Sequence, residues 1–230
     1  MIFFPSSEPM FRSKQAALDI QDLRGLLRLR LRLGSLTLLE THFTRIDQVF
    51  LVWAGISAAI FGTAQFWPTL SWTTQAALWG CLTCVGIVTM SNLAWFWVQV
   101  ERLRWVVYLW SGLMLGGVIL TAHGIFSGVP LILMNLCGLW LSLCAAGYGA
   151  MGIGMRSRSF LLAALMHLAV LPVLSSALAW QFLLTGAVMS GCLLLLACVQ
   201  WDMRQPIEHP DLLSEQDRQF NQQQQRLRRA

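Results

Sequence analysis

Three long segments without any Asp, Glu, Lys or Arg constrain the fold of this chain more than any other feature. They cover residues 48–100, 105–155 and 159–201 and contain 53, 51 and 43 residues. A helix that crosses a hydrocarbon core of about 30 Å needs about 20 apolar residues, so each segment has room for two helices and a turn. Membrane-spanning strands are excluded, because they alternate polar and apolar residues and these segments are apolar on every face.

Chain breakers and interfacial aromatic residues locate one turn in each segment, at residues 67–72, 123–130 and 175–180. The composition agrees, since 56% of the residues are hydrophobic and only 12% are charged. We therefore predict an all-α membrane protein with six transmembrane helices in three hairpins. The expected helices lie at residues 49–66, 75–99, 105–122, 130–154, 159–175 and 180–201.

The positive charges predict the orientation of the chain. All 16 Lys and Arg residues lie in the two terminal regions and in the two links between hairpins, and none lies in the three turns named above. Because loops rich in Lys and Arg stay on the cytoplasmic side, we expect both termini in the cytoplasm. The membrane would be a plasma (inner) membrane or an internal one such as a thylakoid membrane.

Charge divides the chain into three parts: a basic amphipathic arm at residues 1–47, a six-helix transmembrane domain at 48–201, and a polar tail at 202–230. Apolar residues of the segment 38–46 recur at helical spacing, which predicts an amphipathic helix lying on the inner membrane surface. The alternation of Arg and Leu over residues 28–33 is a strand pattern among good helix formers, so this stretch stays open between strand and helix. We expect four arginines of the arm to contact the membrane surface: Arg24, Arg28, Arg30 and Arg32.

The tail predicts one helix, because Ser214 and Asp217 stand at the spacing of a capping box. A second pattern connects the tail to the transmembrane domain. The sequence Val-Gln-x-acidic occurs at the end of two predicted helices, where it leads to Glu101 and to Asp202. This repeat hints at duplication of a helical hairpin.

Few side chains inside the predicted helices could carry chemistry. The three long uncharged segments contain no Asp, Glu, Lys or Arg that could bind an ion inside the membrane, which disfavours a proton- or sodium-coupled transporter of charged solutes. His167 is the ionisable group expected near mid-depth, and we predict that it lines a pocket together with Asn92 and Asn135. The alternative for all three is a structural role, in which they hydrogen-bond to neighbouring helices.

Cys81 and Cys84 are spaced so that both thiols lie on one face of a helix, which allows a redox pair. The alternative is that they pack as small residues. A set of small residues on the fourth predicted helix favours close helix packing, and it comprises Ala145, Gly149, Ala150 and Gly154.

Three functions fit these features. The first is a scaffold, assembly or accessory subunit that interacts with other membrane proteins or pigments. The second is a facilitator or binding protein for an apolar or neutral molecule such as a lipid, quinone or terpenoid, and the third is a membrane thiol redox protein. We expect no enzymatic activity in the first two cases. The expected partners are the lipid bilayer and other membrane proteins or further copies of the chain. No nucleic acid is expected as a partner.

Overall fold

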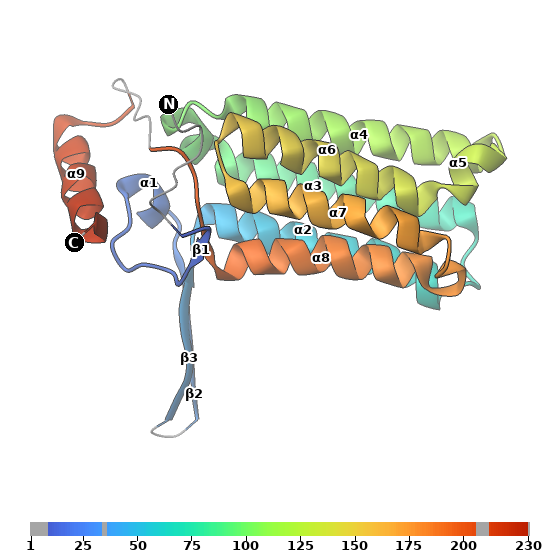
Figure 1. Ribbon diagram of the computed structural model, residues 1–230, viewed down its shortest axis with the longest axis horizontal. Helices are drawn as coiled ribbons and strands as arrows, with labels where there is room; N and C mark the ends of the chain where they lie inside the picture. Colours follow the sequence, from blue (N-terminus) through green and yellow to red (C-terminus); the bar gives the residue numbers. More distant parts are fainter. Residues whose placement is uncertain (1–8, 34–35, 206–211, 230) are drawn as a thin grey trace.

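The computed structural model describes residues 9–33, 36–205 and 212–229, and its main body is a bundle of apolar helices (Figure 1). A helix occupies each of the six predicted ranges. The bounds are α2 (Arg45–Phe66), α3 (Trp72–Val100), α4 (Arg104–Phe126), α5 (Pro130–Met134) with α6 (Leu136–Gly154), α7 (Arg158–Leu174), and α8 (Gln181–Cys198), which follows the 3-10 turn η1 (Leu178–Trp180).

Five of these helical segments are long and apolar enough to cross a membrane: α2, α3, α4, α6, and α8 together with η1. The helix α7 is equally apolar but has 17 residues. The predicted helix 130–154 is interrupted at Asn135, whose backbone (φ −110°, ψ 19°) leaves the helical region and separates α5 from α6. The bundle is therefore an all-α, multi-pass type of architecture.

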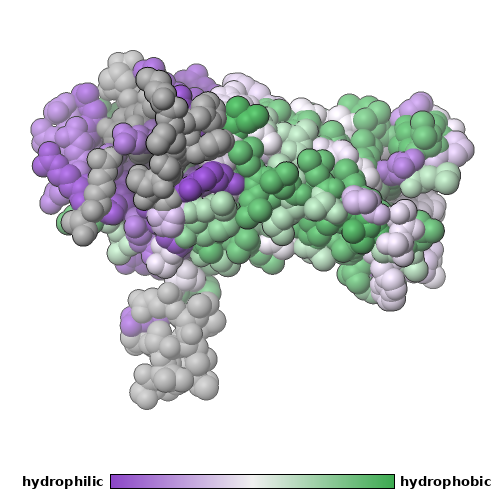
Figure 2. Space-filling view, in the orientation of Figure 1, coloured by the Kyte–Doolittle hydropathy of each residue, from purple (hydrophilic) through white to green (hydrophobic). Residues whose placement is uncertain are grey.

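The helices form a closed ring. Along the chain, α2 packs against α3, α3 against α4, α4 against α6, α6 against α7, and α7 against α8. The ring closes through extensive packing of α2 against α8 (Figure 1). The first and the last helix of the bundle are thus direct neighbours. Figure 2 shows the result on the surface, where apolar side chains cover the side of the bundle and hydrophilic ones gather at the end that carries α1 (Ile20–Leu23) and α9 (Glu215–Arg229).

Glycines let α6 approach its neighbours closely. A Cβ atom at Gly147 would lie 2.8 Å from the ring of Trp110 on α4. One at Gly152 would lie 2.5 Å from the side chain of Leu161 and 2.9 Å from its backbone nitrogen on α7. Real Cβ atoms do not come this close, so any larger residue at either position would push the helices apart.

The small residues predicted for packing contribute unequally. Ala145 is buried, and Gly154 leaves room for the ring of Trp105. A Cβ at Gly149 would be 4.0 Å from its nearest neighbour, which is ordinary contact, and Ala150 is only partly buried. The closest approach of α6 to its neighbours therefore involves Gly154 from this set, together with Gly147 and Gly152.

The prediction of an amphipathic helix at residues 38–46 is wrong. The structure has an antiparallel hairpin there, formed by β2 (Leu27–Leu33) and β3 (Leu36–Phe43), which pairs Arg28 with His42 and Arg30 with Glu40. The two-residue alternation of β2 suits a strand. Directly after β3, Thr44 and Asp47 form a capping box that starts α2 at Arg45. The helical spacing recognised in residues 38–46 therefore belongs to two different elements, the strand β3 and the start of α2.

Both terminal regions meet at one end of the bundle, which we call the charged end (Figure 1). Here β1 (Phe11–Arg12) pairs with β4 (Gln200–Trp201), and α1 contacts α9. The predicted tail helix is confirmed as α9, and so is its capping box. The Asp217 nitrogen donates to the Ser214 hydroxyl at 3.2 Å, and the Ser214 nitrogen donates to the Asp217 carboxylate at 3.1 Å.

Candidate functional site

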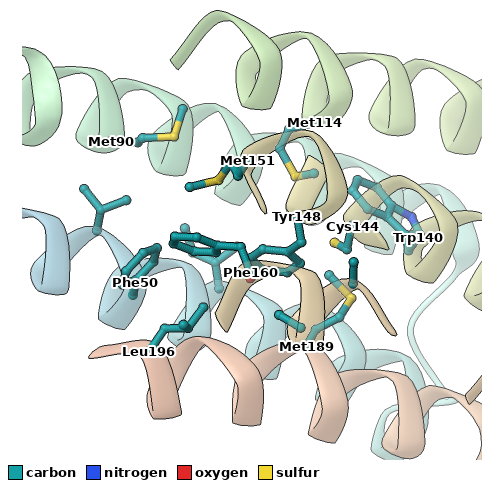
Figure 3. Packing of buried hydrophobic residues seen from close by; sticks show 14 of the residues in the cluster. Phe50, Met90, Met114, Trp140, Cys144, Tyr148, Met151, Phe160, Met189 and Leu196 are labelled. Carbon is teal, nitrogen blue, oxygen red and sulfur yellow. The ribbon is translucent and has the colours of Figure 1, made fainter. Parts of the chain in front are cut away.

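An apolar cavity of about 100 Å³ lies inside the helical ring. Half of its lining residues are aromatic residues or methionines, including Phe50, Trp53, Trp110, Trp140, Tyr148, Met90, Met114, Met151, Met155 and Met189. Figure 3 shows several of them, such as Phe50, Met90 and Met189, converging from different helices around Tyr148 and Phe160. Methionine is unbranched and flexible, so walls of this composition can rearrange around differently shaped guests.

His167 on α7 lines this cavity and is completely buried. Its Nδ1 atom lies 2.8 Å from the backbone oxygen of Ala163. A carbonyl oxygen can only accept a hydrogen bond, so Nδ1 carries the proton and the Nε2 atom of the neutral ring presents a lone pair. This Nε2 atom has no hydrogen-bond partner among the described residues.

Aromatic rings connect His167 to the charged end of the bundle. The Tyr148 ring lies 5.2 Å from the His167 ring and 6.2 Å from Phe160, whose ring is in turn 4.9 Å from Trp201 (centroid distances). Aromatic rings at these separations attract one another beyond their burial. The cavity therefore has a stiff aromatic wall on one side and adaptable methionines around it.

The two asparagines predicted to share a pocket with His167 lie elsewhere. Asn92 is exposed on α3, and Asn135 is exposed between α5 and α6, where its side chain donates to the Leu131 carbonyl at 2.9 Å. Neither lines the cavity. The structure thus brings together His167 and apolar residues, without an amide group beside them.

Cys81 and Cys84 both lie exposed on α3, with free thiols. Neither residue lines the cavity that contains His167.

The charged end contains a second, polar cavity of about 200 Å³. Three residues, Ile46, Trp97 and Trp201, line both cavities and thus separate the polar one from the apolar one. Among the described residues, no group of three or more His, Cys, Asp or Glu side chains could hold a metal ion.

Asp202 organises one side of the charged end. Its buried carboxylate accepts hydrogen bonds of 2.8–3.1 Å from the Ser157 hydroxyl, from the backbone nitrogen and guanidinium of Arg158, and from the backbone nitrogen and hydroxyl of Ser159. The Ser159 hydroxyl also donates to the Met10 carbonyl at 2.8 Å. Burial opposes ionisation of Asp202, but the hydrogen bonds from Arg158 and Ser159 prevail and hold its pKa below the usual value. The carboxylate thereby caps the first turn of α7.

Three acidic residues form a cluster between α1 and the end of α3: Asp19, Asp22 and Glu101. Arg228 from α9 contacts the Asp19 carboxylate at 2.6 Å, and the Trp97 indole donates to Asp22 at 3.1 Å. Burial, followed by the negative charge of Asp19, raises the pKa of Asp22 to about 7, although Arg228 and Trp97 act in the opposite direction. Asp22 therefore changes its protonation state near neutral pH.

Amide side chains connect this cluster to the tail. Asn221, which is completely buried, donates to Gln21 at 3.1 Å and accepts from the Ile20 nitrogen at 2.8 Å. Gln21 donates in turn to the Glu101 carboxylate at 3.0 Å. The tail helix, the arm and the link after α3 are thus joined by one hydrogen-bonded chain.

Arg204 and Lys14 hold further parts of the charged end together. The Arg204 nitrogen donates to the Met155 carbonyl, and its guanidinium donates to the Glu101 carbonyl, each at 2.8 Å. Lys14 forms an ion pair with Asp47 at 2.6 Å and donates to the backbone oxygen of His42 at 2.9 Å. Burial, and then the charge of Lys14, lowers the pKa of His42.

The arginines predicted to contact the membrane surface lie at the same end. Arg24, Arg28 and Arg30 are exposed, and the Arg24 guanidinium lies 3.8 Å above the ring centre of Phe96. The side chain of Arg32 is outside the described part of the molecule.

Apolar helices of this number and length are the architecture of a multi-pass membrane protein. Comparison of the chain with protein-family models, with curated proteins and with solved structures finds no match. The function must therefore be argued from the two cavities themselves.

Sequence reasoning missed the charged end as a site. Its residues are scattered over the arm, the link after α3 and the tail, and an acidic residue in such a region usually faces water. One signal was present, because the repeated Val-Gln-x-acidic pattern leads to Glu101 and Asp202, which are only 2% and 1% exposed.

Proposed function

We propose that the protein binds an apolar molecule that carries one hydrogen-bond donor, such as a hydroxylated lipid, a quinol or a terpenoid alcohol. The apolar part would occupy the cavity in the helical ring, and the donor would bond to the Nε2 atom of His167. The observation that carries this proposal is the buried, unpartnered Nε2 atom at the wall of an apolar cavity. Leaving such an acceptor unsatisfied costs about 1–3 kcal/mol, so a binding partner that satisfies it gains this energy.

The cavity limits the ligand. Its volume of about 100 Å³ is below the range of about 300–1,000 Å³ that holds drug-sized ligands, so a broad macrocycle does not fit between the helices as they stand. A slim chain or a single ring fits better, because the flexible methionine side chains of the walls can move to accommodate the rest of the ligand.

The test compares molecules bound to three purified proteins: the wild type, His167→Phe and His123→Phe. Phenylalanine keeps a ring in the cavity but removes the acceptor, and exposed His123 provides the same substitution away from it. Mass spectrometry of organic extracts should find a hydroxylated apolar compound in the wild type and in His123→Phe. We expect at least about tenfold less of it in His167→Phe, the effect of losing one buried hydrogen bond.

An unchanged extract from His167→Phe, together with a higher melting temperature, would refute the proposal. That result would mean that Nε2 is merely an unsatisfied or hydrated atom, whose removal stabilises the bundle.

A second candidate is an accessory subunit that associates laterally with other membrane proteins. It is favoured by α4, where only 22% of the apolar stretch is buried, compared with 56% in α6. Bulky residues at Tyr108, Leu115, Ile119 and Phe126 are 44–66% exposed along one face of α4. Native mass spectrometry after the mildest extraction tests this idea, and a lone monomer without any co-purifying protein would contradict it.

For the membrane topology we propose that all six apolar helices cross, as three hairpins with both termini in the cytoplasm, in a plasma (inner) or internal membrane. The concentration of Lys and Arg at the end that carries β1 and α9 supports this orientation. The 17 residues of α7 span about 26 Å, close to the hydrocarbon thickness. Trypsin should cut after Arg226 only in permeabilised cells. Cutting in intact cells would show that the termini lie on the outer side and would contradict the proposed orientation.

A further inference from the structure

The hairpin β2–β3 leaves the bundle at the charged end and runs across the helix axes rather than along them (Figure 1). If the helices cross a bilayer, this direction is parallel to the membrane surface. The seven residues of β2 extend over about 23 Å. The hairpin therefore reaches sideways at the level where the helices leave the membrane.

Exposed tryptophans mark this level. Trp95 near the end of α3 is 38% exposed and Trp105 at the start of α4 is 36% exposed. Tryptophan prefers the boundary between hydrocarbon and head groups. The exposed arginines of the links, Arg102, Arg104 and Arg156, lie at the same end of the bundle, so the hairpin begins among residues suited to the head-group layer.

The two faces of the hairpin differ in chemistry. On one face Leu27 pairs with Phe43 and Leu29 with Thr41, while on the other Arg28 pairs with His42. The leucines are 50% and 38% exposed, so the rest of the chain leaves much of this face uncovered. An isolated two-stranded hairpin is marginally stable in water, and an apolar face that stays uncovered makes it less favourable still.

A bilayer surface with anionic lipids provides what both faces need. Leucine side chains can enter the boundary of the acyl chains, and arginine side chains can reach phosphates from the same depth. Each Lys or Arg near an anionic membrane surface also gains electrostatic attraction.

We propose that the hairpin β2–β3 lies on the bilayer surface and binds anionic phospholipid head groups through Arg28 and Arg30, with Leu27 and Leu29 facing the acyl chains. This inference concerns a different ligand and a different part of the molecule from the cavity around His167. It holds or fails independently of that proposal.

Trypsin provides the test, because Arg28 and Arg30 are themselves cleavage sites. The full chain is reconstituted into vesicles of phosphatidylcholine alone, or with about one third phosphatidylglycerol, which makes the surface anionic. Cleavage in the hairpin is measured relative to cleavage after exposed Arg226 of α9 in the same sample. Both sites lie at one end of the molecule, so the ratio does not depend on the direction of insertion.

We expect the ratio to fall by about tenfold or more in the anionic vesicles, since two arginines contribute to the attraction, and to recover at high salt. The double variant Leu27→Gln/Leu29→Gln keeps both cleavage sites and should lose the protection. Arg28→Lys/Arg30→Lys keeps charge and cleavage and should retain it.

Equal ratios in the two kinds of vesicle would overturn the proposal. So would protection that follows the protein-to-lipid ratio instead of lipid charge, because it would show that a second copy of the chain covers the hairpin.

Discussion

The charged end and the interior of the bundle differ in how densely their polar side chains are connected. At the charged end, hydrogen bonds join residues far apart in sequence, such as Ile20 with Asn221 and Arg228 with Asp19. In the interior, His167 bonds to Ala163 within its own helix, and its other nitrogen has no partner among the described residues. A few polar contacts also join the helices, such as the hydrogen bond from Ser190 to the Ala54 carbonyl at 3.0 Å. The docking of the arm and tail therefore depends mainly on polar contacts, whereas the helices pack mainly through the shapes of glycine and aromatic residues.

Because of this difference, we expect substitutions in the two regions to change the stability of the protein for different reasons. Removing a polar group at the charged end leaves buried partners unsatisfied, which is costly. Changing a side chain in the interior acts mainly through volume. Two substitutions and one change of pH, each with a control, separate the two cases.

The largest effect is expected for Asp202→Ala. It would remove a buried acceptor that the Arg158 guanidinium and the hydroxyls of Ser157 and Ser159 share, and we expect a loss of about 3–5 kcal/mol in the free energy of unfolding. Denaturation of the detergent-solubilised protein, followed by circular dichroism, measures this loss. Asp217→Ala removes the acidic member of the capping box at the start of α9 and should cost only about 0.5–2 kcal/mol, so similar losses in both variants would contradict the special role of Asp202.

The next effect concerns Gly152→Ala. The new methyl group would collide with Leu161, so we expect a loss of about 1–3 kcal/mol in the free energy of unfolding. Gly149→Ala on the same helix meets no such neighbour and should be neutral, or stabilising by up to about 1 kcal/mol through helix propensity. The measurement compares the melting curves of the two variants in one detergent. Equal melting temperatures would contradict the prediction, because they would show that α6 and α7 can move apart without loss of stability.

A smaller effect is expected from pH at the charged end. The pKa of Asp22 is raised to about 7 in the folded protein, so the folded state holds this proton more tightly than the unfolded state does. The stabilisation is complete below the ordinary pKa of 3.8 and is lost as the pH rises through 7. Between pH 6 and pH 8 the contribution should fall by about 1.4 kcal/mol.

Asp22→Asn provides the matching control, because the amide cannot titrate. The difference between the melting temperatures at pH 6 and pH 8 should be smaller in this variant than in the wild type. If both proteins change by the same amount, other groups control the pH dependence of the charged end.

The helical part of the fold could be predicted from the sequence because its cause is local. Charge is costly in hydrocarbon, so the uncharged segments and their breakers outline the helices closely. The interruption at Asn135 was missed, since a single polar residue after an apolar turn gives no clear signal. The hairpin β2–β3 was missed because the helical spacing in residues 38–46 crosses from a strand into the capping box of Thr44 and Asp47.

The sites were less predictable because they depend on tertiary contacts. His167 could be singled out as a rare ionisable residue in an apolar segment, but the distance of Asn92 and Asn135 from it follows from how the helices rotate in the ring. Likewise, the raised pKa of Asp22 arises only when Asp19 and the end of α3 are brought beside it. Nothing in the local sequence of α1 announces these neighbours.

The closure of the ring through α2 and α8 has a consequence for how the protein is made. During synthesis α2 emerges first, and its main partner α8 begins 136 residues later, which takes roughly 7–27 s at typical elongation rates. Until then the face of α2 that α8 will cover stays open to lipid or to an insertion factor. The pairing of β1 with β4 waits longer still, since Phe11 and its partner Trp201 are 190 residues apart, so the charged end is completed after the ring. A chain interrupted before α8 would carry a permanently open flank.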